Sequence, residues 1–149
     1  MKTIKTPILL AATALVLTLS LPTSAVDQGF MIVVNDSNPS TTIRAEDLSR
    51  MFLKQTANWP NGIPVVPIDQ AAKNEVRETF SIAVHKRDTD AIRAHWQRMV
   101  FSGRAVPPVE KGSDDEVLST VQANRGAVGY VSASTTLLPG VKVLEVTGL

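Results

Sequence analysis

Amide, carboxylate and guanidinium side chains gather between residues 70 and 77, where the sequence predicts a turn from a strand into a helix. The first four N–H groups of a helix lack intrahelical partners and carry part of the helix dipole, so such turns often hold anions. Residues 69–76 contain no glycine, serine or threonine, which leaves side-chain amides and the main chain to make the contacts. The candidate ligand-binding residues are Gln70, Asn74, Glu75, Val76 and Arg77.

The turn is positioned by an apolar strand before it and an amphipathic helix after it. Residues 65–68 form the short strand. From Lys73 onward, apolar side chains recur at i, i+4, i+7 and i+8, which is the spacing of one helix face. That face consists of Val76, Phe80, Ala83 and Val84. We therefore expect the helix to begin at the carboxyl end of the strand.

The rest of the chain alternates strands with helices. Residues 30–34 are a continuous apolar run, which is typical of a strand buried on both faces. Residues 127–131 and 141–146 complete the predicted strands. Residues 45–54 are predicted to be a helix with Leu48, Met51 and Phe52 at i, i+3 and i+4, followed by a Trp-Pro-Asn-Gly turn over 59–62.

Capping residues bound two further helices. Asp88 is expected to cap the first, which Ser102 and Gly103 end. Its apolar stripe is Ile92, Trp96, Met99 and Val100. Ser113 and Glu116 form a capping box for the second, which ends at residues 124–126. Strands separated by helices predict an α/β fold, a three-layer sandwich with a largely parallel sheet.

The N-terminus has the pattern of a secretory signal peptide. Lys2 and Lys5 precede an apolar run over residues 8–21, and small residues up to Ala25 supply a cleavage site. We therefore divide the chain into a signal peptide, 1–25, and a single domain, 26–149. Cleavage near Ala25 would leave a periplasmic or secreted protein without an integral membrane segment, because no second long apolar run follows.

The composition argues against several classes of function. Without Lys2 and Lys5, the 15 basic residues fall to 13 against 14 acidic ones, which is not the balance of a nucleic-acid-binding protein. The chain has no cysteine, which excludes disulfides and thiol chemistry. We predict no cofactor, and no catalytic serine because the sequence lacks a Gly-x-Ser-x-Gly motif.

Histidines and clustered charges have simpler explanations than catalysis or metal binding. His85 and His95 are ten residues apart, which is not the spacing of a metal pair on one helix face, so both are expected at the surface or at helix ends. Asp114 and neighbouring acidic residues suit helix capping and the helix dipole. The basic residues near the third helix form either a solvated face or a docking face for an acidic partner or lipid headgroups. They are Lys86, Arg87, Arg93, Arg98 and Arg104.

Five segments resemble one protein family in their order and spacing. They are "FMIVVNDSNP", "AEDLSRMFLKQTANWPNG", "VRETFS", "MVFSGR" and "ANRGAVGYVS". Together they resemble the phosphate-type substrate-binding proteins of ABC transporters, which are type 2 periplasmic binding proteins. In that family two α/β lobes close over the ligand. The resemblance runs from about Phe30 to about Ser134 and implies that this chain is similar to the second lobe alone.

The resemblance also locates the family's phosphate loop, Arg-x-Asp-Gly-Ser-Gly-Thr. In the same register Gln70 stands at the arginine position, Ala72 at the aspartate position, and residues 73–76 at the Gly-Ser-Gly-Thr positions. Glu75 adds a negative charge that opposes an anion by about 1 kcal/mol or more at a poorly solvated site. Val76 offers no hydroxyl. Every side chain that carries the family's anion chemistry is therefore changed.

Three functions stay open, and the first two are not enzymatic. The first is an exported solute-binding-like domain that binds phosphate or another small anion weakly through main-chain N–H groups, Gln70 and Asn74. The second is a protein-interaction or sensory accessory module that has lost the anion ligands. The first implies a small anion and a transporter as partners, and the second implies a sensor or another protein. A hydrolase is the least favoured alternative.

Overall fold

The computed structural model describes residues 28–149 of the chain. The signal peptide and the cleavage site proposed for residues 1–25 lie outside this range. Among the described residues, no helix combines the length and the apolar character that crossing a membrane requires.

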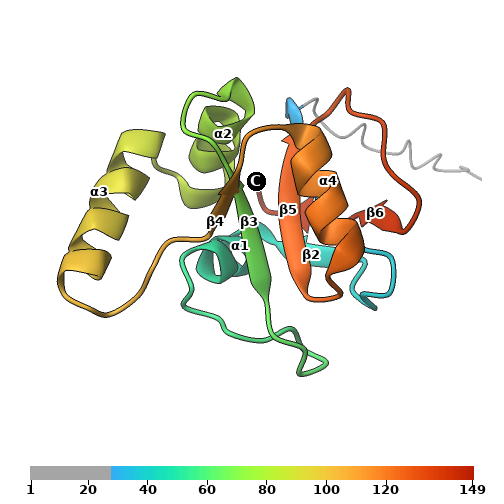
Figure 1. Ribbon diagram of the computed structural model, residues 1–149, viewed down its shortest axis with the longest axis horizontal. Helices are drawn as coiled ribbons and strands as arrows, with labels where there is room; N and C mark the ends of the chain where they lie inside the picture. The colour runs from blue at the N-terminus through green and yellow to red at the C-terminus, as the bar shows by residue number, and fades with distance from the viewer. Residues whose placement is uncertain (1–27) are drawn as a thin grey trace, which may run out of the picture.

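A five-stranded sheet forms the centre of the molecule, with the strand order β4-β3-β5-β1-β6 (Figure 1). The strands are β1 (Phe30–Asn35), β3 (Val66–Gln70), β4 (Val109–Lys111), β5 (Ala127–Ser132) and β6 (Val141–Val143). Strands β4, β3 and β5 run parallel to one another, whereas β1 is antiparallel to both β5 and β6. The sheet is therefore largely parallel, with β1 as the single reversed strand.

Alternation along the strands divides the core between the two faces of the sheet. In β1, Ile32 and Val34 belong to a first core cluster together with Leu48, Phe52 and Phe80. The neighbouring Val33 belongs to a second core cluster with the apolar side chains of α4. Both faces of the sheet are thus buried, as the continuous apolar run over residues 30–34 predicts.

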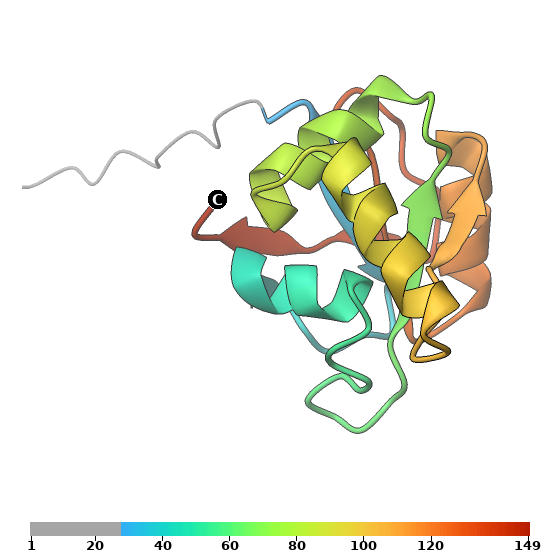
Figure 2. The same cartoon turned by 90° about the vertical axis from the view of Figure 1, so that its left-hand side faces the viewer.

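Helices cover both faces. The first core cluster packs under α1 (Ala45–Phe52), α2 (Glu75–Phe80) and the π-helix η1 (Ser81–His85), and the second packs under α4 (Asp114–Ala123). Helix α3 (Thr89–Phe101) stands at one end of the molecule, beyond β4, as Figures 1 and 2 show. This arrangement confirms the predicted three-layer α/β sandwich.

The predicted caps set the limits of α3 and α4. The Asp88 side chain accepts a hydrogen bond of 2.7 Å from the Ala91 N–H, and Gly103 takes the left-handed conformation just beyond the end of α3. Ser113 Oγ accepts from the Glu116 N–H at 3.3 Å. The Glu116 carboxylate accepts from Gly112, one residue before the N-cap, at 2.8 Å. The capping box is therefore present in a slightly widened form.

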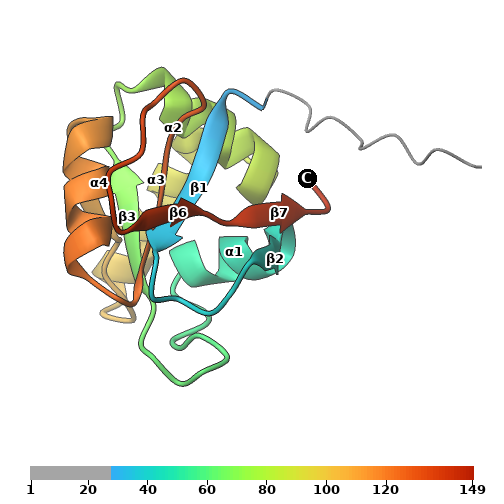
Figure 3. The same ribbon diagram turned by 90° about the vertical axis from the view of Figure 1, so that its right-hand side faces the viewer.

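The single strand predicted over residues 141–146 is wrong. The chain leaves the main sheet after β6 and continues as β7 (Glu145–Thr147), which pairs in parallel with β2 (Thr42–Arg44) in a separate two-stranded sheet (Figure 3). The break falls at Leu144, whose N–H still bonds to the Ile32 carbonyl at 2.9 Å and whose side chain is buried in the first core cluster. The strand-like composition of residues 141–146 cannot reveal that two successive segments pair with different neighbours.

The apolar stripe predicted for α3 is only partly correct. Ile92 and Trp96 are buried, but Val100 is exposed and Met99 is half-buried. The helix predicted from Lys73 begins at Glu75 and changes into η1 after Phe80. Because π-helical turns contain an extra residue, they rotate the following side chains relative to an α-helix.

His85 lies at a helix end, as the sequence predicts, but its ring is turned toward the core. His85 is half-buried at the end of η1, where its Nδ1 lies 2.7 Å from Ser49 Oγ. Its ring makes edge contacts with Phe52 and Phe80 at centroid distances of 6.3 and 5.3 Å. Burial, assisted by the positive charge of Arg87, lowers the pKa of His85 to about 4. His85 is therefore neutral at pH 7.

We expect His85 to make the fold sensitive to mild acid. The unfolded chain, with a histidine pKa of about 6.5, binds a proton more readily than the folded chain. The contribution of neutral His85 to the free energy of unfolding is therefore fully present above pH 6.5 and is lost as the pH falls toward 4. The loss should reach about 3 kcal/mol between pH 7 and pH 4. Urea unfolding at several pH values measures it. In His85→Gln the profile should flatten in this window, and an equally steep profile would assign the effect to other groups.

Candidate functional site

The carboxyl end of β3 carries most of the predicted ligand-binding residues, at the edge where open α/β sheets hold their ligands. Gln70 is the last residue of β3, and Asn74 is the N-cap residue of α2. Both join Arg77 in one hydrogen-bonded network. Glu75 and Val76 do not join it: Glu75 is exposed, and Val76 packs against the first core cluster.

The Gln70 side chain is fully occupied by contacts within the chain. Its Nε2 donates to Asp114 Oδ1 at 2.7 Å and to the Tyr130 carbonyl at 2.9 Å. Its Oε1 accepts from Asn74 Nδ2 at 2.8 Å. Since the side chain is also only 1% exposed, Gln70 has no free amide group to offer a solute.

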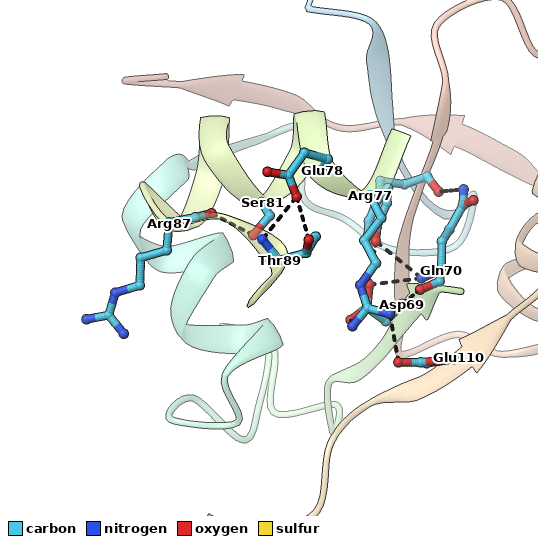
Figure 4. A network of polar contacts seen from close by, with 9 residues as sticks. Asp69, Gln70, Arg77, Glu78, Ser81, Arg87, Thr89 and Glu110 are labelled. Carbon is cyan, nitrogen blue, oxygen red and sulfur yellow. Dashed lines mark hydrogen bonds and ion pairs between the residues drawn. The ribbon is translucent and has the colours of Figure 1, made fainter. Parts of the chain in front are cut away.

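Arg77 is likewise engaged on every side. One guanidinium nitrogen donates to the Gln70 carbonyl at 2.6 Å and to Glu110 Oε1 at 2.7 Å. The other lies 3.1 Å from Asp69 Oδ2 (Figure 4). Arg77 is buried, as is Asp69, whereas Glu110 is half-exposed. The arginine therefore neutralises carboxylates of its own chain, and only 9% of its side chain is exposed.

Tyr130 completes the network from the neighbouring strand β5. Its hydroxyl donates to Asp69 Oδ1 and accepts from the Gln70 N–H at 3.2 Å. Its ring stacks on Phe80 with a centroid distance of 3.9 Å and an interplanar angle of 6°. We refer to the connected residues as the β3 network. They are Asp69, Gln70, Asn74, Arg77, Glu110, Asp114 and Tyr130.

Burial dominates the protonation of the network. Burial raises the pKa of Asp69, although the charge of Arg77 and the Tyr130 hydrogen bond act in the opposite direction. The pKa of Tyr130 is raised by burial and by the adjacent Asp69 carboxylate. For Arg77, burial lowers the pKa, but Asp69 and Glu110 together outweigh it and the net change is upward. The network therefore keeps its tyrosine neutral and its arginine charged.

Asp114 does more than the helix capping that the sequence predicts for it. It stands in the first turn of α4, and one carboxylate oxygen accepts from Gln70. The other accepts from the Ser132 N–H at 3.1 Å and from Thr135 Oγ1 at 2.5 Å. Asp114 thus links α4 to the ends of β3 and β5.

A second group of polar contacts joins α2 and η1 to the start of α3 (Figure 4). The Glu78 carboxylate accepts from the Thr89 N–H at 3.0 Å and from its hydroxyl at 2.5 Å. Ser81 Oγ donates to the Arg87 carbonyl at 2.7 Å. These contacts fix the loop between η1 and α3.

The charge of the β3 network is unfavourable for an anion. It contains one cation, Arg77, and three carboxylates, those of Asp69, Glu110 and Asp114. An incoming phosphate would meet this net negative charge and would have to replace existing hydrogen bonds of buried groups. The arrangement is therefore suited to holding β3, β5, α2 and α4 together, and its charge disfavours phosphate.

Reasoning from the sequence missed Asp69 and Tyr130, which lie at the centre of the network. Asp69 follows a short apolar strand, and a carboxylate in a buried strand requires a partner. That position is a usable signal for a buried ion pair. Tyr130 leaves no comparable signal, because it contacts Asp69 across 61 residues of sequence.

The acidic and histidine side chains of the described residues do not form a metal site. Within residues 28–149, no group of three or more His, Cys, Asp or Glu side chains is placed to hold a metal ion. His95 is half-buried, and its Nε2 has no hydrogen-bond partner. Its ring lies edge-on to Trp96 at 5.1 Å, and burial lowers its pKa.

A cavity of about 590 Å³ opens beside the network, between α3 and the segment that leads into β4. Its apolar walls come from Trp96, Val100, Phe101 and Pro107. Arg77 and Glu110 border it from the network side. Its volume falls within the range of small-molecule pockets, about 300–1,000 Å³.

No protein-family model matches the chain, and no curated protein matches it. Solved structures do. A phosphate ABC transporter substrate-binding protein with bound phosphate from Clostridium perfringens aligns with a TM-score of 0.64 and 18% identity, over 81% of this chain and 46% of that chain. An ABC-type phosphate transport receptor from Vibrio cholerae aligns with a TM-score of 0.62 and 23% identity, over 79% and 46%. PstS from Borrelia burgdorferi aligns with a TM-score of 0.61 and 14% identity, over 80% of this chain and 47% of that chain.

The chain spans less than half the length of each of these structures. This proportion agrees with the resemblance to one of two lobes. At these identities the likeness concerns the fold and not the ligand. The chain therefore has the mixed α/β fold of one lobe of a phosphate-type periplasmic binding protein.

Proposed function

We propose that this protein is an exported, non-enzymatic accessory domain that keeps the fold of a solute-binding lobe and acts through contacts with another protein. The observation that carries the proposal is the β3 network. The side chains that could bind an anion, Gln70, Asn74 and Arg77, are bonded to one another and to carboxylates. The N-terminal pattern of residues 1–25 supports export, and the fold supports descent from a binding protein.

A phosphate titration tests the loss of ligand. We expect isothermal titration calorimetry of the purified protein to give no binding tighter than millimolar for phosphate, because displacing buried hydrogen bonds and adding charge beside three carboxylates both cost free energy. The matched control is Glu75→Gln, which removes an exposed negative charge at the predicted site without touching the network. It should bind no better. Micromolar binding by either protein would contradict the proposal.

Contact with another protein needs its own experiment. A photo-reactive amino acid placed at exposed positions in turn, in cells that produce the protein, should give a covalent adduct with one particular protein from one surface and not from the others. Adducts distributed evenly over all surfaces, or none at any position, would contradict a role in protein contact.

Weak binding of a small anion is the second candidate, and one observation favours it. Asn74, the N-cap residue of α2, makes no capping hydrogen bond with its side chain, because its amide is directed to Gln70 and Gly112. Main-chain N–H groups in the first turn are thus not capped by that side chain. In the same titration this candidate predicts millimolar affinity that weakens with added salt.

A further inference from the structure

The cavity of about 590 Å³ beside α3 takes its walls from two segments of the chain. Trp96, Val100 and Phe101 line it from α3, and Pro107 lines it from the segment that leads into β4. The Trp96 ring is only 6% exposed, whereas Phe101 is 97% exposed. Figures 1 and 2 show α3 and β4 at the same end of the molecule, away from β1 and β6. We refer to this site as the α3 cavity, and it presents aromatic and apolar surface to a ligand.

Contacts within the chain hold the walls of the α3 cavity in place. Trp96 is one of the two buried side chains that anchor α3. At the end of the helix, the Gly103 N–H donates to the Val100 carbonyl at 3.0 Å. On the opposite wall, Lys54 Nζ donates to the Pro107 carbonyl at 3.4 Å, and proline has a fixed φ angle. Because the walls are already ordered, a ligand binds without the entropy cost of forming them.

The charged side chains that line the α3 cavity are neutralised in pairs. Arg93 lies 2.9 Å from Asp90, and Arg77 lies 2.7 Å from Glu110. A charged ligand would lose its hydration on entering and would meet no unpaired opposite charge in the wall. The α3 cavity therefore favours an uncharged ligand.

One uncharged polar side chain in the wall has hydrogen-bonding capacity to spare. Gln97 lines the cavity, is exposed, and forms no side-chain hydrogen bond with another described residue. Thr89 also lines the cavity, but its hydroxyl already donates to the Glu78 carboxylate at 2.5 Å. A side-chain amide accepts through its oxygen and donates through its nitrogen. Gln97 therefore provides one polar contact, which suits a ligand that carries a hydroxyl, an N–H group or a carbonyl.

We propose that the α3 cavity binds a small, uncharged aromatic molecule that carries one hydrogen-bonding group. The rings of the ligand pack against Trp96 and Pro107 and cover Phe101, and its polar group bonds to Gln97. Aromatic rings gain from offset or edge contacts with tryptophan and phenylalanine, beyond the area that they bury. The inference goes beyond the proposed function, since it requires neither contact with another protein nor a change in the hydrogen bonds of the β3 network. Its failure would leave the phosphate titration unaffected.

Two fluorescent dyes that share one aromatic framework test the class of ligand. N-phenyl-1-naphthylamine is uncharged and carries one N–H group, and 8-anilino-1-naphthalenesulfonate adds a sulfonate to the same rings. We expect saturable binding of the uncharged dye to the purified protein, with a Kd at least about 10-fold lower than that of the sulfonate. Arg98 and Arg104 are exposed on and just after α3 but do not line the cavity. Tighter or equal binding of the sulfonate would overturn the proposal, and so would the absence of saturable binding of the uncharged dye.

A variant of the wall tests where the dye binds. Val100→Glu places a charge in the apolar wall and should raise the Kd of the uncharged dye at least about 30-fold. The matched control is Val143→Glu, because Val143 is 46% exposed, against 52% for Val100, and lies on β6 outside the cavity. It should leave the Kd unchanged. Circular dichroism checks that both variants are folded, and Val100→Ser replaces Val100→Glu if it is not. Unchanged binding by the folded wall variant would place the dye elsewhere and overturn the proposal.

Competition against the uncharged dye tests the role of Gln97. The competitors are 2-naphthol and naphthalene, which differ only by a hydroxyl group. Gln97→Leu should weaken competition by 2-naphthol about 5-fold, because the hydroxyl loses its partner, and should leave competition by naphthalene unchanged. An equal effect on both competitors, or no effect on either, would show that the ligand needs no hydrogen-bonding group and would overturn that part of the proposal.

Discussion

Replacing Arg77 with methionine should lower the free energy of unfolding by about 3–5 kcal/mol, because it leaves a buried carboxylate without its partner. Asp69 is buried beside Arg77 at 3.1 Å, and no other cation contacts it among the described residues. Methionine keeps much of the side-chain volume, so the loss reports on charge more than on packing. Urea unfolding followed by circular dichroism measures it.

Two further variants identify the cause. Arg93→Met removes an arginine whose ion pair with Asp90 is exposed, and it should cost less than about 1 kcal/mol. Adding Asp69→Asn to Arg77→Met removes the stranded carboxylate and should recover a large part of the lost stability. A cost for Arg77→Met no greater than that of Arg93→Met would show that the buried pair does not hold the turn.

The pH dependence of Arg77→Met should have a definite sign. Burial raises the pKa of Asp69, and removing Arg77 removes the main influence that lowers it. The folded variant then binds a proton more tightly than the unfolded chain, whose aspartate pKa is about 3.9. The contribution of Asp69 to its stability should therefore fall as pH rises above that value, and its deficit relative to the native protein, in which His85 acts equally, should be smaller at pH 4 than at pH 7.

Replacing Trp96 with alanine should cost about 3–5 kcal/mol, as large aromatic truncations in buried sites do. Trp96 is 6% exposed, and with Ile92 it is one of the two buried side chains of α3. Because these two residues anchor α3, we expect the loss to show first as opening of that helix. Hydrogen exchange of the α3 amides measures the opening of the helix, and urea unfolding measures the loss of global stability.

The exposed end of the same helix supplies the control for Trp96→Ala. Val100→Ala truncates a side chain that is 52% exposed and should cost less than about 1 kcal/mol. Unchanged exchange rates in α3 of Trp96→Ala would show that the loop contacts of Glu78 and Ser81, and not the tryptophan, hold the helix in place.

Local patterns predicted the elements of this fold because their causes are local. Asp88 and Ser113 cap helices through groups only three residues away, and Gly103 ends α3 by its own backbone conformation. The exposure of Val100 was missed because a helix stripe records spacing but not whether a neighbour is present. The division at Leu144 was missed because strand pairing is decided by residues 32 and 42–44, far away in the sequence.

The position of the candidate site was predictable from the sequence, but the contacts of its side chains were not. The strand-to-helix turn at Gln70 and Asn74 lies where the sequence predicts it. The hydrogen-bond partners of these side chains could not be predicted from the sequence, because Gln70 contacts Asp114 and Tyr130 across 44 and 60 residues. Only the structure shows that the side chains of Gln70 and Asn74, which were expected to contact a solute, form a hydrogen bond with each other.

The reversed strand β1 has a consequence for the order in which the molecule can assemble. β1 begins at Phe30, but its two neighbours, β5 and β6, begin only at Ala127 and Val141. During synthesis from the N-terminus, this apolar strand therefore stays without its strand partners until β5 and β6 have been made. Closing a loop of about 100 residues also makes the pairing slow. β1 is thus made before β5 and β6 and can be paired only after both are available.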